Sequence, residues 1–246
     1  MLIGGLQKLT LVDYPGKVAA TVFLIGCNFK CGFCQNPELI SVERRTVLRN
    51  YGGQSSVKEA DFFDFLDSEQ GLIDGVCITG GEPTIHSDLI DFIKKIKDKG
   101  FLIKLDTNGS NPEILEKLIK EKLIDFVAMD IKTSIPKYEK VYPVKSRNAG
   151  AAKQLFNRVK KSVEIIKNSG IDYEFRTTAV PGIVEKEDIE KIGQWLQGVK
   201  KFALQQFQNK KVLDEEFEKI QPYSEEILKE FKKILEKCID KVELRI

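Results

Sequence analysis

The stretch CNFKCGFC (27–34) begins one glycine after the run VAATVFLI (18–25). That run is almost entirely apolar, which is typical of a strand buried in a sheet. Cys27, Cys31 and Cys34 are three of the chain's five cysteines. Three thiolates on one short loop can bind a common metal centre. The stretch therefore predicts a buried strand with a metal site directly after it.

The three cysteines leave two kinds of metal site open. A structural zinc ion normally has four ligands, and the fourth would come from Cys77, Cys238 or the single histidine, His86. Each of these has a simpler interpretation, which is packing for the two cysteines and a helix start for the histidine. A [4Fe–4S] cluster held by only three cysteines instead keeps one iron open for a substrate or cofactor. The spacing alone does not decide between them.

Composition and charge indicate an ordinary globular protein. Of the 246 residues, 42% are hydrophobic and 31% are charged, and the formal net charge is +2. This balance gives no reason to expect nucleic acid or an anionic membrane as a partner. The sequence has no apolar run of about eighteen residues, and its N-terminus lacks the pattern of a signal peptide. Five cysteines are too few for a disulfide framework in a chain of this length. The expected location of the protein is therefore the reducing cytoplasm.

Short apolar strands alternate with amphipathic helices along the chain. After the first strand, the sequence predicts strands at 75–79, 101–106, 125–131, 172–180 and 201–207, and helices at 57–68, 87–100, 111–122, 151–168, 185–197 and 224–238. Repeated βα units predict a parallel sheet with helices outside it. We therefore expect an α/β fold with one domain over 1–246, whose core at about 18–208 is a partial (β/α)6 TIM-like barrel. Short extensions flank the core, and the C-terminal one is a helix and a strand at 223–246.

Polar and glycine-rich segments follow the predicted strands. After the cysteine loop they are GGEPT (80–84), DTNG (106–109), MDIK (129–132), RTTAVPG (176–182) and LQQF (204–207). In parallel α/β folds the active site lies at the carboxyl ends of the strands. These segments therefore predict one active site at one face of the barrel.

GGEPT and MDIK each have a structural and a functional interpretation. Gly80 and Gly81 could form only a tight turn, or they could let the backbone approach a ligand, with Glu82 as an acceptor for an ammonium group. Asp130 and Lys132 are two residues apart and so point to the same side of a strand. They could pair with each other, or they could bind a ligand.

DTNG and RTTAVPG leave the orientation of their side chains open. Asp106, Thr107 and Asn108 either form a turn or place polar atoms at the mouth of the barrel. Arg176 and Thr178 share one face of their strand, and Thr177 takes the other. The sequence does not fix which of these faces looks inward.

The chain resembles the radical S-adenosylmethionine (radical SAM) superfamily. The resemblance rests on C-x3-C-x-aromatic-C, with Phe33 as the aromatic residue, followed by GGE at the second strand end. Within the superfamily, the chain is similar to enzymes that activate glycyl radical enzymes. DTNG, the D-x-K of MDIK and VPG occur in this order in pyruvate formate-lyase activating enzymes. GGLQKLTLVDYPGK (4–17) and GCNFKCGFCQNPEL (26–39) resemble activators of anaerobic ribonucleoside-triphosphate reductase.

The resemblance implies a [4Fe–4S] cluster on the three loop cysteines, with SAM bound at the open iron. The implied SAM contacts are Gly80, Gly81 and Glu82 at the methionine amino group, Lys132 at the carboxylate, Phe33 at the adenine, and Thr107, Asn108 and Asp130 around the ribose or carboxylate, with Arg176 and Thr177 as further candidates. A monovalent cation between Asp106 and Asp130 is also implied.

The implied activity is reductive cleavage of SAM to a 5′-deoxyadenosyl radical, which takes a hydrogen atom from a glycine of a partner glycyl radical enzyme. Anaerobic ribonucleotide reductase is the first expected partner, and a flavodoxin or ferredoxin-type protein is the expected electron donor. The alternatives are a pyruvate formate-lyase-type activase, a radical SAM enzyme acting on a small molecule and, from a different class, a zinc-stabilised binding module without catalysis. Because a protein substrate must enter the barrel, we expect an open lateral or bottom face and a mobile segment near 133–150.

Overall fold

The computed structural model describes residues 1–41, 57–141 and 149–246. Within these residues, the strands form one eight-stranded sheet in the order β1 to β8. β1 runs antiparallel to β2, and β2 to β8 are all parallel. The bounds are β1 Ile3–Thr10, β2 Ala19–Leu24, β3 Gly75–Gly80, β4 Leu102–Thr107, β5 Phe126–Asp130, β6 Asp172–Ala179, β7 Lys201–Gln206 and β8 Lys241–Arg245. The predicted parallel sheet is confirmed, and the C-terminal tail is its last strand.

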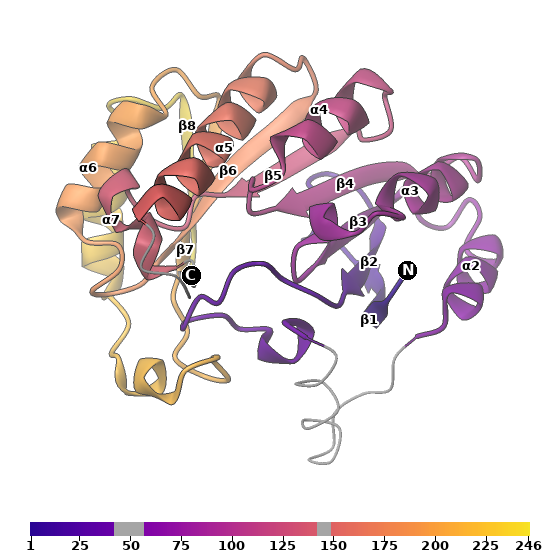
Figure 1. The fold of residues 1–246 in the computed structure, drawn as a ribbon, viewed down its shortest axis with the longest axis horizontal. Helices are drawn as coiled ribbons and strands as arrows, with labels where there is room; N and C mark the ends of the chain where they lie inside the picture. The colour runs from indigo at the N-terminus through magenta and orange to yellow at the C-terminus, as the bar shows by residue number, and fades with distance from the viewer. Residues whose placement is uncertain (42–56, 142–148) are drawn as a thin grey trace.

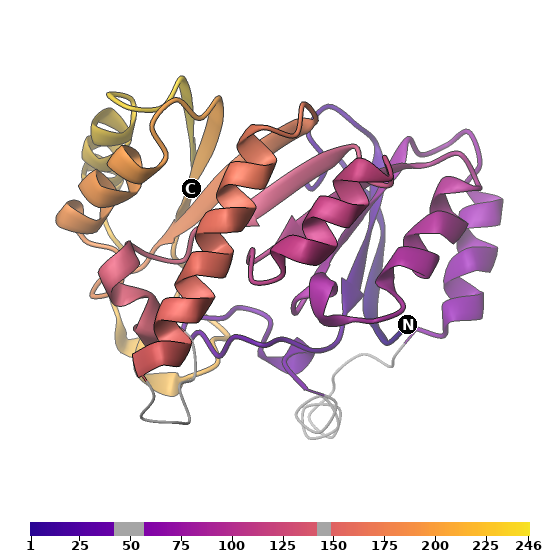
Figure 2. The same cartoon turned by 45° about the horizontal axis from the view of Figure 1, so that its top comes forward.

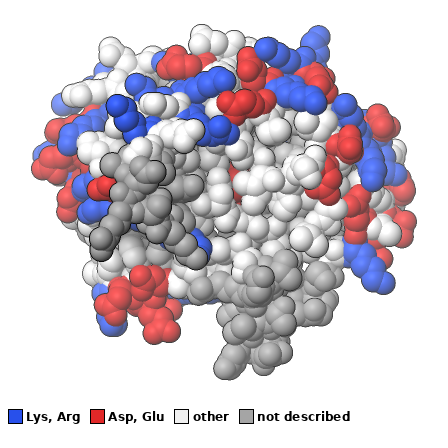
Figure 3. Space-filling model, in the orientation of Figure 1, with Lys and Arg blue, Asp and Glu red and all other residues white. Residues whose placement is uncertain are grey.

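Helices lie along one face of the curved sheet (Figures 1 and 2). Their bounds are α2 Glu59–Ser68, α3 Leu89–Lys97, α4 Pro112–Lys120, α5 Ala149–Lys167, α6 Lys186–Trp195 and α7 Glu225–Leu235, with short 3-10 helices η1 Pro37–Leu39, η2 Pro83–Ile85, η3 Ile135–Lys140 and η4 Glu215–Lys219. α4 begins at Pro112, because proline fits the first position of a helix. On the face seen in Figure 3, basic and acidic side chains are interspersed around the rim, and the centre is mostly uncharged.

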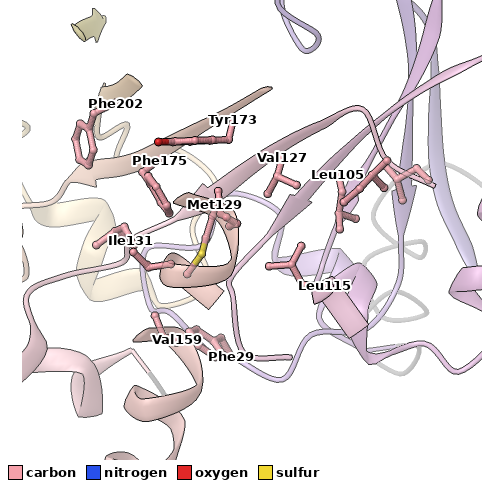
Figure 4. Close-up of a cluster of buried hydrophobic side chains, with 14 of the residues drawn as sticks. Phe29, Leu105, Leu115, Val127, Met129, Ile131, Val159, Tyr173, Phe175 and Phe202 are labelled. Carbon is pink, nitrogen blue, oxygen red and sulfur yellow. The ribbon is translucent and has the colours of Figure 1, made fainter. Parts of the chain in front are cut away.

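The two faces of the sheet differ in polarity because successive side chains of a strand point to opposite sides. On the helix side, Leu105, Val127 and Met129 are fully buried in one hydrophobic cluster with Leu115 of α4 and Val159 of α5 (Figure 4). Burying each large aliphatic side chain stabilises the fold by roughly 1.5–3 kcal/mol. This packing fixes which side chains are left to face the inside of the barrel.

The inner face is lined by polar and charged residues instead. Lys104, Asp106, Asp130 and Arg176 alternate with the apolar residues of β4, β5 and β6. Because β1 and β8 stand at the two ends of the sheet order, the described strands form a barrel that is not closed by pairing between them. The partial barrel with an open side agrees with the prediction.

The N-terminal extension differs from the prediction, because it forms a strand of the sheet. β1 pairs with β2, but the register shifts between Ile3 and Gly5 and again between Gln7 and Thr10. Each irregularity breaks the period of two by which a strand is recognised in a sequence. Two consecutive glycines lower the strand propensity further.

The segment expected to be mobile near 133–150 is anchored where the structure describes it. Thr133 Oγ1 donates to Ile183 O at 2.7 Å, and Ser134 Oγ donates to Asp188 Oδ1 at 2.5 Å. Tyr138 of η3 is buried. These contacts hold 133–141 against the fold, the predicted mobility stays a prediction, and residues 142–148 lie outside the described residues.

Candidate active site

A cavity of about 250 Å³ lies at the carboxyl ends of the parallel strands. It brings together nearly all of the predicted site residues, which are Cys27, Cys31, Phe33, Cys34, Gly80, Gly81, Glu82, Thr107, Asn108, Asp130, Lys132 and Arg176. Further lining residues are Phe29, Gln35, Asn36, Ile40, Thr79, Asp106, Thr178 and Gln205. The structure therefore brings these predicted residues to one cavity at the strand ends, and their roles stay predictions.

The three loop cysteines all line this cavity. Burial raises the pKa of the Cys27 thiol to about 12 and that of Cys31 to about 11. Cys31 Sγ donates to Val141 O at 3.7 Å, and the backbone N–H of Cys34 donates to Cys31 O at 3.0 Å. These thiols hold their protons at neutral pH, so a bound metal must displace them.

The arrangement does not match a single zinc ion. Among the described residues, no three His, Cys, Asp or Glu side chains are grouped so that they could hold one metal ion. Cys77, Cys238 and His86 do not line the cavity. Cys77 is buried in β3 with Lys104 Nζ at 3.5 Å, and Cys238 lies beside Gly193 of α6. Among the described residues, none of these three candidates for a fourth zinc ligand lies at the cavity, and three cysteines there suit a [4Fe–4S] cluster with one open iron.

The two glycines of GGEPT pack closely against the chain that leads into the cysteine loop, and their contact with a ligand stays a prediction. A Cβ atom on Gly81 would lie 1.9 Å from Gly26 O, and one on Gly80 would lie 2.3 Å from Leu24 N. Gly80 also has a φ of 122°, which favours glycine. The glycines therefore let the loop after β3 approach the chain that leads into Cys27. The backbone N–H of Glu82 donates to Gly26 O at 2.7 Å and fixes this contact.

The Glu82 carboxylate joins two strand-end loops. It is fully buried, and its Oε1 accepts from Thr107 Oγ1 at 2.7 Å and from the N–H and hydroxyl of Thr84 at 3.1 and 2.5 Å. Its Oε2 accepts from the backbone N–H of Asn108 at 2.6 Å. Burial raises the pKa of this carboxyl, although the hydrogen bonds oppose the rise. Since each carboxylate oxygen can accept two hydrogen bonds, Oε2 keeps capacity for a ligand.

Asn28 extends this network to the cysteine loop, and sequence reasoning missed it. Asn108 Nδ2 donates to Asn28 Oδ1 at 2.9 Å, and Asn28 Nδ2 donates to Ser110 Oγ at 2.8 Å. The loops after β2, β3 and β4 are therefore joined by hydrogen bonds. The only signal in the sequence was the position of Asn28 beside Cys27.

Arg176 links two carboxylates inside the barrel. Its Nε lies 2.9 Å from Asp130 Oδ1, and its NH1 lies 3.0 Å from Asp106 Oδ2. Lys132 Nζ lies 2.8 Å from the other oxygen of Asp130, and Lys104 pairs with Asp106. Three cations against two carboxylates leave one positive charge in this group. The guanidinium spans the position at which the family resemblance implies a monovalent cation.

These pairs shift the acidity of both aspartates. Burial alone would raise the pKa of Asp130, but the Arg176 guanidinium and the Lys132 ammonium hold it well below its usual range. The pKa of Asp106 is lowered against the effect of burial by Arg176 and Lys104. Both carboxylates are therefore ionised at neutral pH, and the internal Asp130–Lys132 pair is present.

Of the two remaining predicted residues, Thr177 lies outside the cavity and Phe33 lies in its lining. Thr177 is buried and donates its hydroxyl to Ile131 O at 2.7 Å, outside the cavity, so it does not join the other predicted residues. Arg176 and Thr178 take the inner face. Phe33 lines the cavity, and its ring centroid lies 6.0 Å from that of Phe217 in η4.

Comparison with known proteins agrees with this geometry. The family model described as the radical SAM superfamily matches residues 21–196. A Methanocaldococcus jannaschii protein, whose name assigns it to the glycyl-radical enzyme activating enzymes, is 38% identical over 99% of this chain and 95% of that protein. The pyruvate formate-lyase-activating enzyme of Streptococcus mutans is 27% identical over 81% of this chain and 73% of that enzyme.

A solved structure supports the fold. SuiB of Streptococcus suis matches with a TM-score of 0.61 at 15% identity, over 91% of this chain and 47% of that chain. This chain thus spans about half of SuiB, and the likeness concerns the fold alone. Taken together with the cysteine loop and the GGE segment at one cavity, the matches show that this chain is an enzyme of the radical SAM superfamily and belongs to its glycyl-radical enzyme activating enzymes.

Proposed function

We propose that this enzyme generates a radical on a glycine of a partner protein, and that the partner is anaerobic ribonucleotide reductase. The observation that carries the proposal is the cavity itself. Three cysteine thiols, the Glu82 loop and a net positive charge near Arg176 face one space, and no fourth cysteine or histidine lines it among the described residues. The resemblance of 4–17 and 26–39 to the activators of that reductase favours this partner over pyruvate formate-lyase.

The superfamily implies a [4Fe–4S] cluster and SAM, and the residues here fit both. Cys27, Cys31 and Cys34 would hold the cluster and leave one iron for SAM. Glu82 Oε2 would accept from the methionine amino group, and Lys132 would attract the carboxylate. When bound, these groups supply reductive cleavage of the SAM carbon–sulfur bond and abstraction of a hydrogen atom from the substrate.

The remaining implied contacts are proposals of the same kind. Phe33 would pack beside the adenine, and Thr107 and Asn108 would position the ribose or carboxylate region through the loop that Glu82 holds.

We propose that the Arg176 guanidinium occupies the position of the expected monovalent cation and supplies its positive charge. A cation between Asp106 and Asp130 would have to displace a guanidinium that already pairs with both. Arginine stays protonated at all relevant pH values, so its charge is permanent. SAM binding should accordingly be insensitive to added K⁺ or Na⁺ at constant ionic strength. An increase in SAM affinity that is specific to one of these ions would favour the metal cation instead.

A flavodoxin or ferredoxin-type electron donor and a cytoplasmic location complete the proposal. None of the described helices is long and apolar enough to cross a membrane. The small net charge continues to predict no nucleic-acid partner.

The direct test is anaerobic incubation of the reconstituted enzyme with SAM, dithionite and purified anaerobic ribonucleotide reductase. We expect a glycyl radical signal in the reductase by electron paramagnetic resonance, and no signal when SAM is omitted. Pyruvate formate-lyase in a parallel reaction is the comparison for partner choice. SAM cleavage without a radical in either protein would favour a small-molecule substrate.

A further inference from the structure

One wall of the cavity consists of Thr178 of β6 and Gln205 of β7. The two residues are register partners in the parallel ladder, so their side chains stand next to each other on the inner face of the barrel. Both are partly buried. This wall faces the same space as the cysteine loop but belongs to different strands, which come later in the sheet order.

The side chains of this wall are not used to hold the fold. Glu82, Asp130, Lys132 and Arg176 all make ion pairs or hydrogen bonds within the protein. In contrast, neither the Thr178 hydroxyl nor the Gln205 carboxamide makes a hydrogen bond to another residue that the structure describes. Their donors and acceptors are therefore available to a ligand in the cavity.

The wall lies near β8, at one of the two edges where the sheet is not closed into a full barrel. Gln205 is also in register with Arg245 of β8, which is the last strand in the sheet order. Arg245 is itself paired with Glu174 at 2.7 and 3.0 Å. The open side of the barrel next to Gln205 thus presents a charge that is already neutralised, and an uncharged chain segment can approach without leaving a charge unpaired.

The chemistry of the two side chains matches a peptide main chain. A carboxamide has both a donor and an acceptor, as a peptide group has, and a hydroxyl can serve as either. A glycine offers no side chain to recognise, so an enzyme that selects a glycine must hold its two flanking peptide groups. Uncharged groups suit this task because peptide groups carry no net charge.

We propose that Thr178 and Gln205 bind the main-chain N–H and C=O groups that flank the target glycine of the protein substrate. The inference rests on the proposed function and adds the residues that position the glycine. Thr178 and Gln205 are positioning residues, since they act through the peptide groups and not on the Cα–H bond that breaks.

The test uses a blocked peptide, acetyl-Ala-Ala-Gly-Ala-Ala-amide, with deuterium at the glycine Cα. Transfer of deuterium into 5′-deoxyadenosine by the reconstituted enzyme reports the reaction at that carbon. We expect Gln205→Leu and Thr178→Val each to raise the KM for the peptide about tenfold, which corresponds to one lost hydrogen bond of about 1.4 kcal/mol, with a smaller change in kcat.

Two further variants separate the hydrogen bonds from general damage. Thr178→Ser keeps the hydroxyl and should retain the KM of the unaltered enzyme. Gln194→Leu makes the same substitution as Gln205→Leu, but on the exposed surface of α6, and should leave the KM unchanged. Thermal unfolding of each variant checks that the chain still folds.

The outcomes distinguish this inference from the proposed function. If the unaltered enzyme forms no glycyl radical in the reductase and transfers no deuterium from the peptide, the proposed function fails and the inference fails with it. If it forms the radical in the reductase but transfers no deuterium from the peptide, only the inference is overturned, because the peptide groups beside a glycine would then not be enough for binding. If deuterium is transferred but both Gln205→Leu and Thr178→Val keep the KM within about twofold, only the inference is overturned. It is also overturned if the dissociation constant of SAM rises as much as the KM, because the two residues would then belong to the cofactor site.

Discussion

Replacing Arg176 with methionine removes the guanidinium that joins Asp106 to Asp130. The arginine side chain is only 13% exposed, and both of its ion pairs are about 3 Å long. Breaking a buried pair costs about 3–5 kcal/mol, because the remaining charge stays buried without its partner. Lys104 and Lys132 still pair with the two aspartates, so we expect the lower end, a loss of about 3 kcal/mol in the free energy of unfolding. For a chain of this size, that loss lowers the melting temperature by roughly 6–12 °C.

The sign of the pH dependence follows from the aspartates. Their pKa values in the folded protein lie below the ordinary value of 3.8. The stabilisation by Arg176 is therefore fully present above pH 3.8 and is lost as the pH falls toward the lowered pKa values. In the Arg176→Met variant these pKa values rise, so acid weakens the variant less. The difference in stability between the two proteins must shrink as the pH falls below about 4.

Denaturation by urea at pH 7 and at acid pH measures both effects. The fluorescence of Trp195, the single tryptophan, reports unfolding of the cluster-free chain under reducing conditions. Lys186→Met is the matched control, because Lys186 forms an ion pair with Glu230 in which both side chains are more than half exposed. It should leave stability unchanged. A loss of less than about 1 kcal/mol for Arg176→Met at pH 7, or an equal loss at both pH values, would refute this reasoning.

Three further outcomes test the site. Gly81→Ala places a Cβ atom against Gly26 O and should reduce iron uptake during anaerobic reconstitution, whereas full uptake would contradict the role given to this contact. Glu82→Gln turns an amide N–H₂ toward donors such as the Thr107 hydroxyl. The dissociation constant of SAM, measured by equilibrium dialysis, should therefore rise about tenfold or more. An unchanged dissociation constant would show that the carboxylate is dispensable. Cys31→Ser should abolish the brown colour and most of the bound iron, and stoichiometric zinc in the unaltered protein would contradict the cluster.

The main features of the fold, and the gathering of the candidate site residues at one cavity, were predictable from local sequence patterns. Apolar strands such as 18–25 and the amphipathic helices between them repeat often enough to define a parallel sheet. The strand-end rule then placed the cysteine loop, GGEPT and MDIK at one cavity. These inferences need only the neighbours of each residue along the chain.

Features that depend on contacts between distant residues were not predictable in this way. Period two put Thr177 and Arg176 on opposite faces, but only the packing of β6 beside Ile131 shows which face is inside. The position of Arg176 between two aspartates requires three strands to be in register. The packing of Phe217 against Gly32 joins parts of the chain that no local pattern connects.

The measurement that tests the central claim most directly is hydrogen transfer from the partner protein. Anaerobic ribonucleotide reductase that contains glycine deuterated at Cα is incubated with the reconstituted enzyme, SAM and dithionite. The account predicts deuterium in the 5′-deoxyadenosine produced, together with a glycyl radical in the reductase. Formation of 5′-deoxyadenosine without deuterium, and with no glycyl radical, would contradict it.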